Sequence, residues 1–342
     1  MPSRWIGLLL FAACSTSQAE YAPEMNTPTG SVKIYDEDAY LLLHYDMRPV
    51  IRSHNHEWTE GPLWVDEGGY LLFSDIPENR IYKYKPGVGT KVYLERSGAT
   101  GLVEGDYTQG SNGLLLDGEG RLVLMQQGDR RVATMDAPVD EPAASYITLA
   151  DRYDSKRLNS PNDAVYDSNG SMYFTDPPYG LPGLVDDERR ELSFQGVYRL
   201  DPDGELVLID DAVSYPNGIG LSPDGTTLYV AVSDVDDAVW LAYDVEPDGS
   251  VSNRRVFYDA NELAGKAGEY GYPDGMAVHS SGFIFATGPG GVWLFSPEGV
   301  PVARILTGRA TANCTLSADE GTLYITADDT LMSLLLNEAP GR

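Results

Sequence analysis

Short apolar runs typical of β-strands recur along the chain, each beginning at a polar residue and followed by a turn that contains glycine. The turn glycines are separated by 51, 50, 55, 57 and 39 residues, and they are Gly69, Gly120, Gly170, Gly225, Gly282 and Gly321. The polar residue precedes the first glycine by nine positions and the others by eight; the six are Glu60, Asn112, Asn162, Asn217, Asp274 and Asn313. A repeat of this length, rich in short strands, is typical of a β-propeller with four strands per blade. The pattern therefore predicts an all-β fold, a six-bladed β-propeller.

The six polar residues occupy equivalent positions at the start of each blade's inner strand. Because inner strands surround the central axis of a propeller, six residues far apart in the sequence are expected to converge on one ring. An Asn-Gly or Asp-Gly pair is by itself first a turn former, but each blade already has a separate turn downstream. We therefore expect a functional site in the central tunnel.

No Pro/Ser-rich linker separates the repeats, so residues 51–336 are expected to form one propeller domain. Residues 20–50 are expected to close it, with the apolar segments of residues 31–50 adding an outer strand to the last blade and covering its edge. The longest irregular insertion, residues 176–195, is a candidate lid over the axial site.

The amino terminus reads as an export signal, with a positive residue, a short apolar stretch and small residues in residues 1–19. Cleavage after Ala19 would release the protein to the periplasm or the medium. Alternatively, Phe11-Ala12-Ala13-Cys14 resembles a bacterial lipobox, which would leave a lipid anchor on Cys14 of an outer-membrane lipoprotein. The apolar stretch is too short to cross a bilayer, which needs roughly 20 residues.

The chain is strongly acidic, with a formal net charge of −28 that becomes −29 once Arg4 leaves with the signal. Such a charge repels nucleic acid and anionic membrane surfaces. We therefore expect a small-molecule ligand and a monomer or small oligomer. Because Cys14 lies in the signal, Cys314 is left without a disulfide partner.

The predicted ring combines two carboxylates, Glu60 and Asp274, with four amides. Carboxylate and amide oxygens suit calcium, which takes six to eight oxygen ligands at about 2.3–2.6 Å, whereas zinc favours His and Cys. The sequence has no Gly-x-Ser-x-Gly elbow, His-Glu-x-x-His, Cys-x-x-Cys or phosphate-binding loop. The residues thus predict a divalent metal site, with Ca²⁺ as the expected ion, in the central tunnel.

Several motifs, spread over residues 50–335, together resemble the gluconolactonase / senescence marker protein / luciferin-regenerating family, and its bacterial gluconolactonase-like branch in particular. They are Thr59-Glu60-Gly61-Pro62-Leu63-Trp64, Leu72-Phe73-Ser74-Asp75-Ile76-Pro77-Glu78-Asn79-Arg80, Arg157-Leu158-Asn159-Ser160-Pro161-Asn162-Asp163, Tyr173-Phe174-Thr175-Asp176-Pro177-Pro178-Tyr179-Gly180, Pro216-Asn217-Gly218 and Pro273-Asp274-Gly275-Met276.

The resemblance implies a six-bladed propeller that hydrolyses lactones with one divalent metal, usually calcium. It implies Glu60, Asn162, Asn217 and Asp274 as metal ligands, and it leaves Asn112 and Asn313 as substrate-contacting or structural residues. One departure concerns blade two, where many relatives have His-Gly and this chain has Gln127-Gly128. Gln127 can hydrogen-bond a substrate but cannot titrate.

These residues suggest a mechanism in which the metal polarises the lactone carbonyl and Asp274 assists the attack of water. Asp274 could act as general base or as nucleophile. Candidate substrate-binding residues near the metal loop and in blade two are Asn112, Arg157, Asn159, Asp163 and Gln127. Two other readings of the ring are open: a phosphoester or organophosphate hydrolase, and a non-catalytic binding propeller that calcium stabilises. Fold alone does not decide among them.

Overall fold

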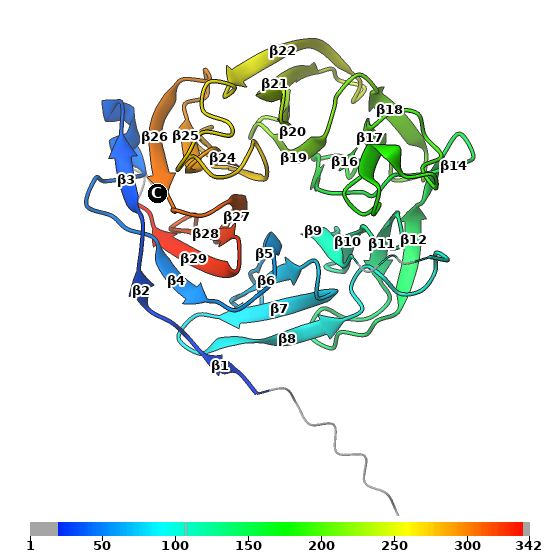
Figure 1. The fold of residues 1–342 in the computed structure, drawn as a ribbon, viewed down its shortest axis with the longest axis horizontal. Helices are drawn as coiled ribbons and strands as arrows, with labels where there is room; N and C mark the ends of the chain where they lie inside the picture. The colour runs from blue at the N-terminus through cyan, green and yellow to red at the C-terminus, as the bar shows by residue number, and fades with distance from the viewer. Residues whose placement is uncertain (1–19, 106, 108, 338–342) are drawn as a thin grey trace, which may run out of the picture.

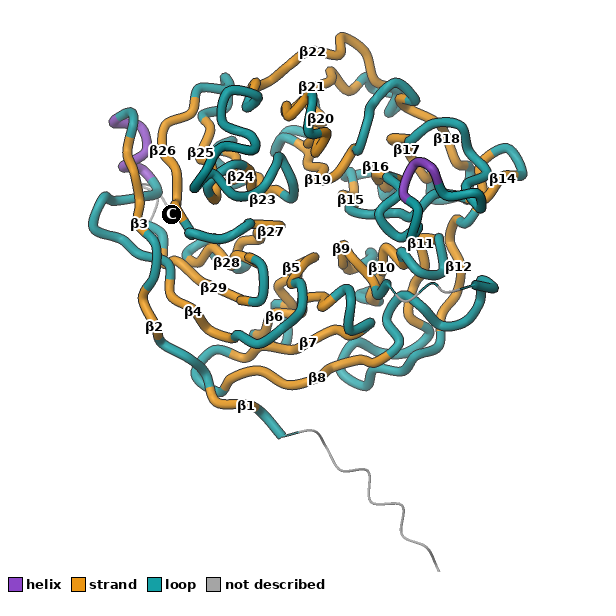
Figure 2. The backbone as a smooth tube through the Cα atoms, in the orientation of Figure 1, coloured by secondary structure: helices purple, strands orange, loops and turns teal. Residues whose placement is uncertain are grey.

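A computed structural model describes residues 20–105, 107 and 109–337, so the predicted export signal lies outside the described residues. Six antiparallel sheets stand around a central axis like the blades of a propeller (Figures 1 and 2). The prediction of an all-β, six-bladed propeller is confirmed. Helical structure in the described residues is confined to two 3-10 segments, Glu37–Leu41 and Leu184–Asp186, and neither is long or apolar enough to cross a membrane.

Each blade has four strands that run from the axis outward, and the innermost strand begins within two residues of the predicted ring position. The first three blades consist of β5 (Thr59–Val65), β6 (Tyr70–Asp75), β7 (Arg80–Lys85) and β8 (Gly89–Glu95); β9 (Ser111–Leu116), β10 (Leu122–Gln126), β11 (Arg131–Met135) and β12 (Tyr146–Ala150); and β15 (Ala164–Tyr166), β16 (Met172–Asp176), β17 (Gly196–Leu200) and β18 (Leu206–Asp210).

The last three blades consist of β19 (Pro216–Leu221), β20 (Thr227–Asp234), β21 (Asp237–Val245) and β22 (Val251–Asp259); β23 (Met276–Val278), β24 (Ile284–Gly288), β25 (Gly291–Phe295) and β26 (Pro301–Leu306); and β27 (Thr311–Leu316), β28 (Thr322–Ala327), β29 (Thr330–Leu335) and β4 (Val50–Ser53). A small hairpin, β13 (Arg152–Tyr153) and β14 (Lys156–Arg157), links blades two and three.

The amino-terminal segment runs around the outside of three blades. Because β4 pairs with β29, the chain that precedes blade one supplies the outer strand of blade six and closes the ring. The expectation for residues 31–34 is wrong in detail, since β3 (Ser31–Ile34) pairs with β26 and lies in blade five. Two short strands, β1 (Ala22–Pro23) and β2 (Thr27–Pro28), extend blades one and six. Each addition covers an edge that would otherwise expose unpaired backbone groups.

Apolar side chains fill the space between neighbouring blades. One cluster joins Val123 of blade two to Phe174 of blade three, and another joins Trp240 of blade four to Phe295 of blade five. Strands β6, β16 and β24 are buried along their whole length because a blade lies against each face. This explains why these strands are continuous apolar runs in the sequence rather than alternating ones.

Candidate functional site

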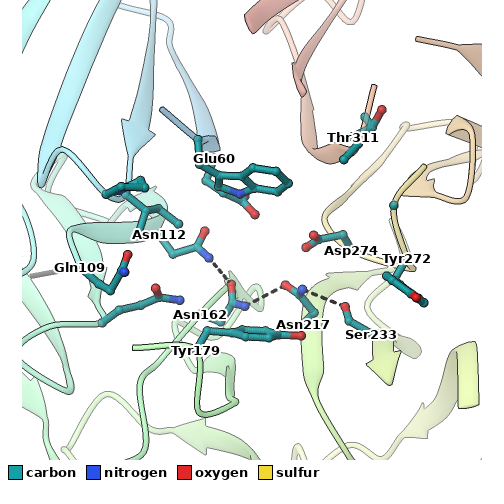
Figure 3. A pocket seen from close by; sticks show the side chains of 16 residues that line it. Glu60, Gln109, Asn112, Asn162, Tyr179, Asn217, Ser233, Tyr272, Asp274 and Thr311 are labelled. Carbon is teal, nitrogen blue, oxygen red and sulfur yellow. Dashed lines mark hydrogen bonds between the residues drawn. The ribbon is translucent and has the colours of Figure 1, made fainter. Parts of the chain in front are cut away.

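A cavity of about 540 Å³ opens at one end of the central tunnel. Five of the six predicted ring residues line it, and Figure 3 shows their side chains pointing toward the axis. Around them lie aromatic, apolar and further polar residues: Trp58, Ile76, Pro77, Gln109, Gln127, Tyr179, Ser233, Gly271, Tyr272, Ala310 and Thr311. The cavity therefore has a polar floor and walls of mixed character, as a site for a small polar molecule requires.

Irregular strand pairing turns the ring residues toward the axis. The pairing of the inner strand with its neighbour shifts between Glu60 and Leu63 in blade one and between Pro216 and Ile219 in blade four. Such bulges re-aim a side chain at the end of a strand. The polar ring residue can then face the cavity although the rest of its strand packs between blades.

The glycines that follow the ring residues allow the inner strands to approach one another. A Cβ atom on Gly275 would lie 1.9 Å from the side chain of Asn313, and one on Gly218 would lie 2.3 Å from the carbonyl oxygen of Asp274. In the same layer the N–H of Gly275 donates to the carbonyl of Ala312 at 2.8 Å. These glycines thus serve close packing around the axis, where any side chain would collide.

Three asparagines form a directional chain of hydrogen bonds across the cavity floor (Figure 3). Asn112 Nδ2 donates to Asn162 Oδ1 at 2.6 Å, and Asn162 Nδ2 donates to Asn217 Oδ1 at 2.8 Å. Asn217 Nδ2 donates to Ser233 Oγ at 2.9 Å, and Ser233 Oγ donates to the carbonyl of Pro273 at 2.5 Å. Each amide is held in one orientation by this chain, and the oxygens of Asn162 and Asn217 each accept one hydrogen bond and keep a second lone pair.

Glu60 and Asp274 are the carboxylates of the floor. Glu60 is 3% exposed, and its Oε2 accepts a hydrogen bond from the N–H of Gly61 at 3.0 Å. Burial raises the pKa of Glu60 to about 8, with a further contribution from the charge of Asp163. Burial, and then the charges of Glu60 and Asp163, raise the pKa of Asp274 well above its ordinary value. Because no positive group among the described residues offsets this, both carboxylates are held in an environment that disfavours their charge.

The donor set of the floor fits a hard divalent cation. Asp274 Oδ1 is buried and has no hydrogen-bond partner among the described residues. No three His, Cys, Asp or Glu side chains come together as a metal-binding group within residues 20–105, 107 and 109–337. A cation at this floor would therefore depend on the amide oxygens of Asn162 and Asn217 in addition to Glu60 and Asp274. Such an all-oxygen set is what calcium prefers.

Asn313, the sixth predicted ring residue, lies below the cavity floor. Its Oδ1 accepts from the N–H of Cys314 at 2.8 Å, and its Nδ2 lies 3.4 Å from Asp163 Oδ2. Both Asn313 and Asp163 line a second cavity, of about 480 Å³, with later residues of the inner strands. A shift in strand pairing between Thr311 and Asn313 means that Thr311, and not Asn313, lines the first cavity of about 540 Å³ (the upper cavity).

Only some of the predicted substrate-binding residues line the upper cavity. Asn112 and Gln127 line the upper cavity, where Asn112 Oδ1 and Gln127 Nε2 are buried without hydrogen-bond partners among the described residues. Arg157, Asn159 and Asp163 do not line it.

Hydrogen bonds hold Asn159, and an ion pair holds Arg157, away from the cavity. Asn159 is fully buried, and its Nδ2 donates to the carbonyls of Asp176 and Phe194, both at 3.0 Å. The guanidinium of Arg157 lies 3.5 Å from Asp151 on the hairpin between blades two and three. These contacts hold both side chains outside the set of residues that line the upper cavity.

Sequence reasoning missed several cavity residues. Trp58 lies two residues before Glu60, and Tyr179 lies within the insertion of residues 176–195 that was predicted as a lid, so both had weak signals. The ring of Tyr179 packs against that of Tyr215, with centroids 5.7 Å apart. Gln109 had no signal, because it lies in a loop without a repeated counterpart.

Comparison with known proteins places the chain in a family. Residues 58–329 match the family model described as the SMP-30/Gluconolactonase/LRE-like region. The chain is 37% identical over 329 residues to a gluconolactonase of Zymomonas mobilis, which covers 94% of this chain and 91% of that one. It is 28% identical over 273 residues to a pentonolactonase of Haloferax volcanii, with 78% and 80% covered. A solved gluconolactonase structure from Xanthomonas campestris has a TM-score of 0.77 at 30% identity, over 93% of this chain and 98% of that one. This chain belongs to the SMP-30/gluconolactonase/LRE-like family.

Proposed function

We propose that this protein is a lactonase that hydrolyses sugar-type lactones, with a divalent cation, calcium, at the floor of the upper cavity. The observation that carries the proposal is a pair of carboxylates, Glu60 and Asp274, at the base of a cavity that could hold a small molecule, with Asp274 Oδ1 unpartnered. The 37% identity to a gluconolactonase over nearly the whole chain supports the same reaction.

Glu60, Asn162, Asn217 and Asp274 would hold the cation through their side-chain oxygens. When bound, it would stabilise the negative charge that develops on the lactone carbonyl oxygen, an effect of several kcal/mol. The hydrogen-bonded chain from Asn112 to Ser233 fixes two of these oxygens before substrate arrives. A preorganised floor of this kind needs no rearrangement during the reaction.

Asp274 is the residue that we assign to proton transfer. Water attacks the carbonyl carbon and gives a proton to Asp274. The bond from that carbon to the ring oxygen then breaks, and Asp274 returns the proton to the ring oxygen, which becomes a hydroxyl group. A carboxylate has two oxygens, so one oxygen of Asp274 would hold the cation while the other accepts the proton of water; Oδ1 has no competing hydrogen bond among the described residues. Direct attack by the Asp274 carboxylate is the alternative.

Two other unpartnered atoms favour a hydroxylated substrate. Gln127 Nε2 is a buried donor and Asn112 Oδ1 is a buried acceptor, and both residues line the cavity. Leaving such groups unsatisfied costs about 1–3 kcal/mol each. Since a hydroxyl group both donates and accepts, the hydroxyls of a sugar lactone would satisfy them.

Replacement of Asp274 by Asn tests the assignment. The variant keeps the shape of the side chain and loses its basicity, so we expect kcat to fall by at least 10²-fold, the lower range for loss of a general base. Single-turnover hydrolysis in ¹⁸O-labelled water separates base from nucleophile: label in the Asp274 carboxylate would show nucleophilic attack. An Asp274→Asn variant with unchanged kcat would contradict the proposal.

We also propose that the protein is exported and acts on lactones outside the cytoplasm, as the sequence of residues 1–19 indicates. Mass spectrometry of the mature amino terminus would distinguish cleavage after Ala19 from a lipid on Cys14. A product that retained Met1 to Ala19 unmodified would contradict export.

A further inference from the structure

Gln109 lines the cavity although it is not one of the six residues at the repeated ring position. It lies on the connection between blades one and two, and its side chain faces the cavity on the same side as Asn112 (Figure 3). Its backbone, but not its side-chain amide, has hydrogen-bond partners among the described residues. That amide can donate and accept hydrogen bonds, as a ligand with hydroxyl groups requires.

The backbone at Gln109 is attached to the turn between β10 and β11. The carbonyl of Gln109 accepts from the N–H of Gly128 at 3.1 Å, and the carbonyl of Gly110 accepts from the N–H of Gln127 at 3.3 Å. A Cβ atom on Gly128 would lie 2.5 Å from the carbonyl oxygen of Gln109. Gln109 and Gln127 are therefore presented to the cavity by one shared backbone arrangement.

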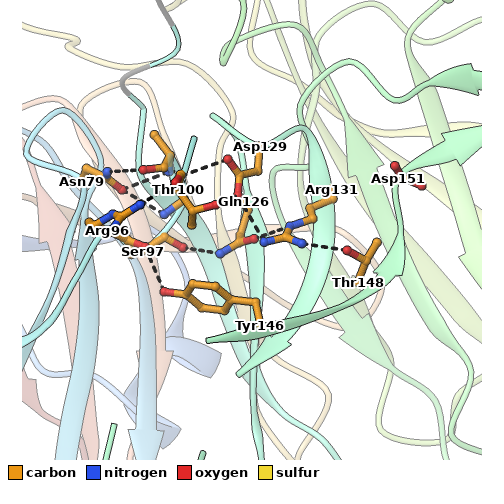
Figure 4. Close-up of polar contacts among 12 residues, drawn as sticks. Asn79, Arg96, Ser97, Thr100, Gln126, Asp129, Arg131, Tyr146, Thr148 and Asp151 are labelled. Atoms are coloured by element: carbon orange, nitrogen blue, oxygen red, sulfur yellow. Dashed lines mark hydrogen bonds and ion pairs between the residues drawn. The ribbon is translucent and has the colours of Figure 1, made fainter. Parts of the chain in front are cut away.

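The other end of the same connection is held by Asp129 (Figure 4). Its Oδ1 accepts from the N–H of Thr100 at 2.9 Å, and its Oδ2 accepts from Thr100 Oγ1 at 2.5 Å. The N–H of Asp129 donates to the carbonyl of Gly98 at 2.7 Å. The connection is thus fixed at Gly98–Thr100 and again at Gln109–Gly110.

A buried charged network holds Asp129 in turn. Arg131 Nη2 lies 3.1 Å from Asp129 Oδ2, and the side chains are 7% and 1% exposed. Arg131 Nε donates to Gln126 Oε1 at 2.6 Å, and Gln126 Nε2 donates to the carbonyl of Ser97 at 2.7 Å. A buried ion pair is weak evidence for stability, because apolar residues of similar volume often serve as well. What this pair does provide is a fixed geometry for the connection.

We propose that Gln109 is a specificity-determining residue that hydrogen-bonds a hydroxyl group of the substrate, and that Asp129 is a positioning residue that holds Gln109 at the cavity wall. The inference rests on the proposed lactonase function and extends it to the choice of substrate. The side chains of the Asp129 network do not line the cavity, so the network acts on it through the backbone that presents Gln109.

The test compares two lactones of equal ring size, glucono-δ-lactone with its hydroxyl groups and δ-valerolactone without them, after subtraction of spontaneous hydrolysis. Gln109→Leu should raise KM for glucono-δ-lactone about tenfold, the loss expected for one hydrogen bond, with kcat within about twofold. For δ-valerolactone, kcat/KM should change less than about twofold, because that substrate offers no hydroxyl group to Gln109.

A double-mutant cycle then tests Asp129. Asp129→Ala should raise KM for glucono-δ-lactone about fivefold in the wild-type background and less than about twofold in the Gln109→Leu background. If Asp129→Ala does not fold, Thr100→Val, which removes the contact at 2.5 Å, serves in its place. Asp201→Asn is the matched control, because it weakens another Arg–Asp pair, with Arg199, in blade three. It should leave both KM values unchanged.

Three results would overturn the inference. If Gln109→Leu lowers kcat/KM equally for the two lactones, Gln109 does not recognise a hydroxyl group of the substrate. Equal effects of Asp129→Ala in the two backgrounds would show that Asp129 does not act through Gln109. Wild-type protein inert toward both lactones would refute the proposed function itself, and the inference with it.

Discussion

Replacing Glu60 by Gln should stabilise the metal-free protein at neutral and alkaline pH and abolish its response to calcium. The charge of Glu60 is the cause of both effects. In the metal-free protein no positive group of the described residues partners the buried carboxylate, and burial raises its pKa from 4.5 to about 8. A neutral amide of the same shape removes this unfavourable charge, but it also removes a negatively charged ligand.

The size and sign of the effect follow from linkage. A carboxyl group whose pKa is raised on folding contributes stability that is fully present below about pH 4.5 and is lost as the pH rises through about 8. One pKa unit corresponds to about 1.4 kcal/mol, so metal-free wild-type protein should lose up to about 4 kcal/mol between pH 5 and 8 from this group. Glu60→Gln should lack this loss.

Urea unfolding of chelator-treated protein at pH 5, 6.5 and 8, with and without calcium, measures the effect. Calcium at about 100 times its Kd should stabilise the wild type by about 2.7 kcal/mol at pH 8, and Glu60→Gln by much less. Glu67→Gln, in the exposed turn of blade one, is the control and should follow the wild type. The reasoning is refuted if metal-free Glu60→Gln is less stable than wild type at pH 8, or if calcium stabilises both equally.

Further predictions concern packing and substrate contacts. Gly275→Ala should cost at least about 3 kcal/mol of stability, because its Cβ would overlap the side chain of Asn313. Gly118→Ala, where nothing lies within 4 Å of the new Cβ, should change the stability by no more than about 0.5 kcal/mol. Chemical denaturation of the two variants compares these values. Asn159→Ala should lower the free energy of unfolding by about 2 kcal/mol, since the carbonyls of Asp176 and Phe194 lose their donor, and should leave KM within about twofold. A raised KM at full stability would instead make Asn159 a substrate contact. Arg157→Ala should leave both KM and kcat within about twofold in the same assay, and a tenfold loss would place Arg157 at the site after all.

The sequence carries much of the fold because the inner half of each blade repeats. A polar residue followed eight or nine positions later by a turn glycine marks the inner hairpin of every blade. The outer strands have no such fixed spacing, which is why residues 31–34 could not be assigned to blade five from the pattern. Their position depends on which outer edge lies within reach, and that is a property of the assembled ring.

The floor of the site was predictable and its walls were not. Glu60, Asn112, Asn162, Asn217 and Asp274 meet because a repeated position in the sequence becomes a ring in space. Asn313 has the same spacing, but a local shift in strand pairing places it below the floor. Wall residues such as Gln109 and Tyr179 come from connections that differ from blade to blade, so no repeat reveals them.

The most direct test of the central claim is lactone hydrolysis by protein stripped of metal, measured with glucono-δ-lactone before and after calcium is added. We predict that turnover falls to the spontaneous rate without metal, returns with calcium in the wild type, and does not return in Asp274→Asn. Full turnover by the stripped protein would contradict the role of the cation. No turnover under any condition, with calcium still raising the unfolding temperature, would contradict the lactonase and leave the ring as a binding site.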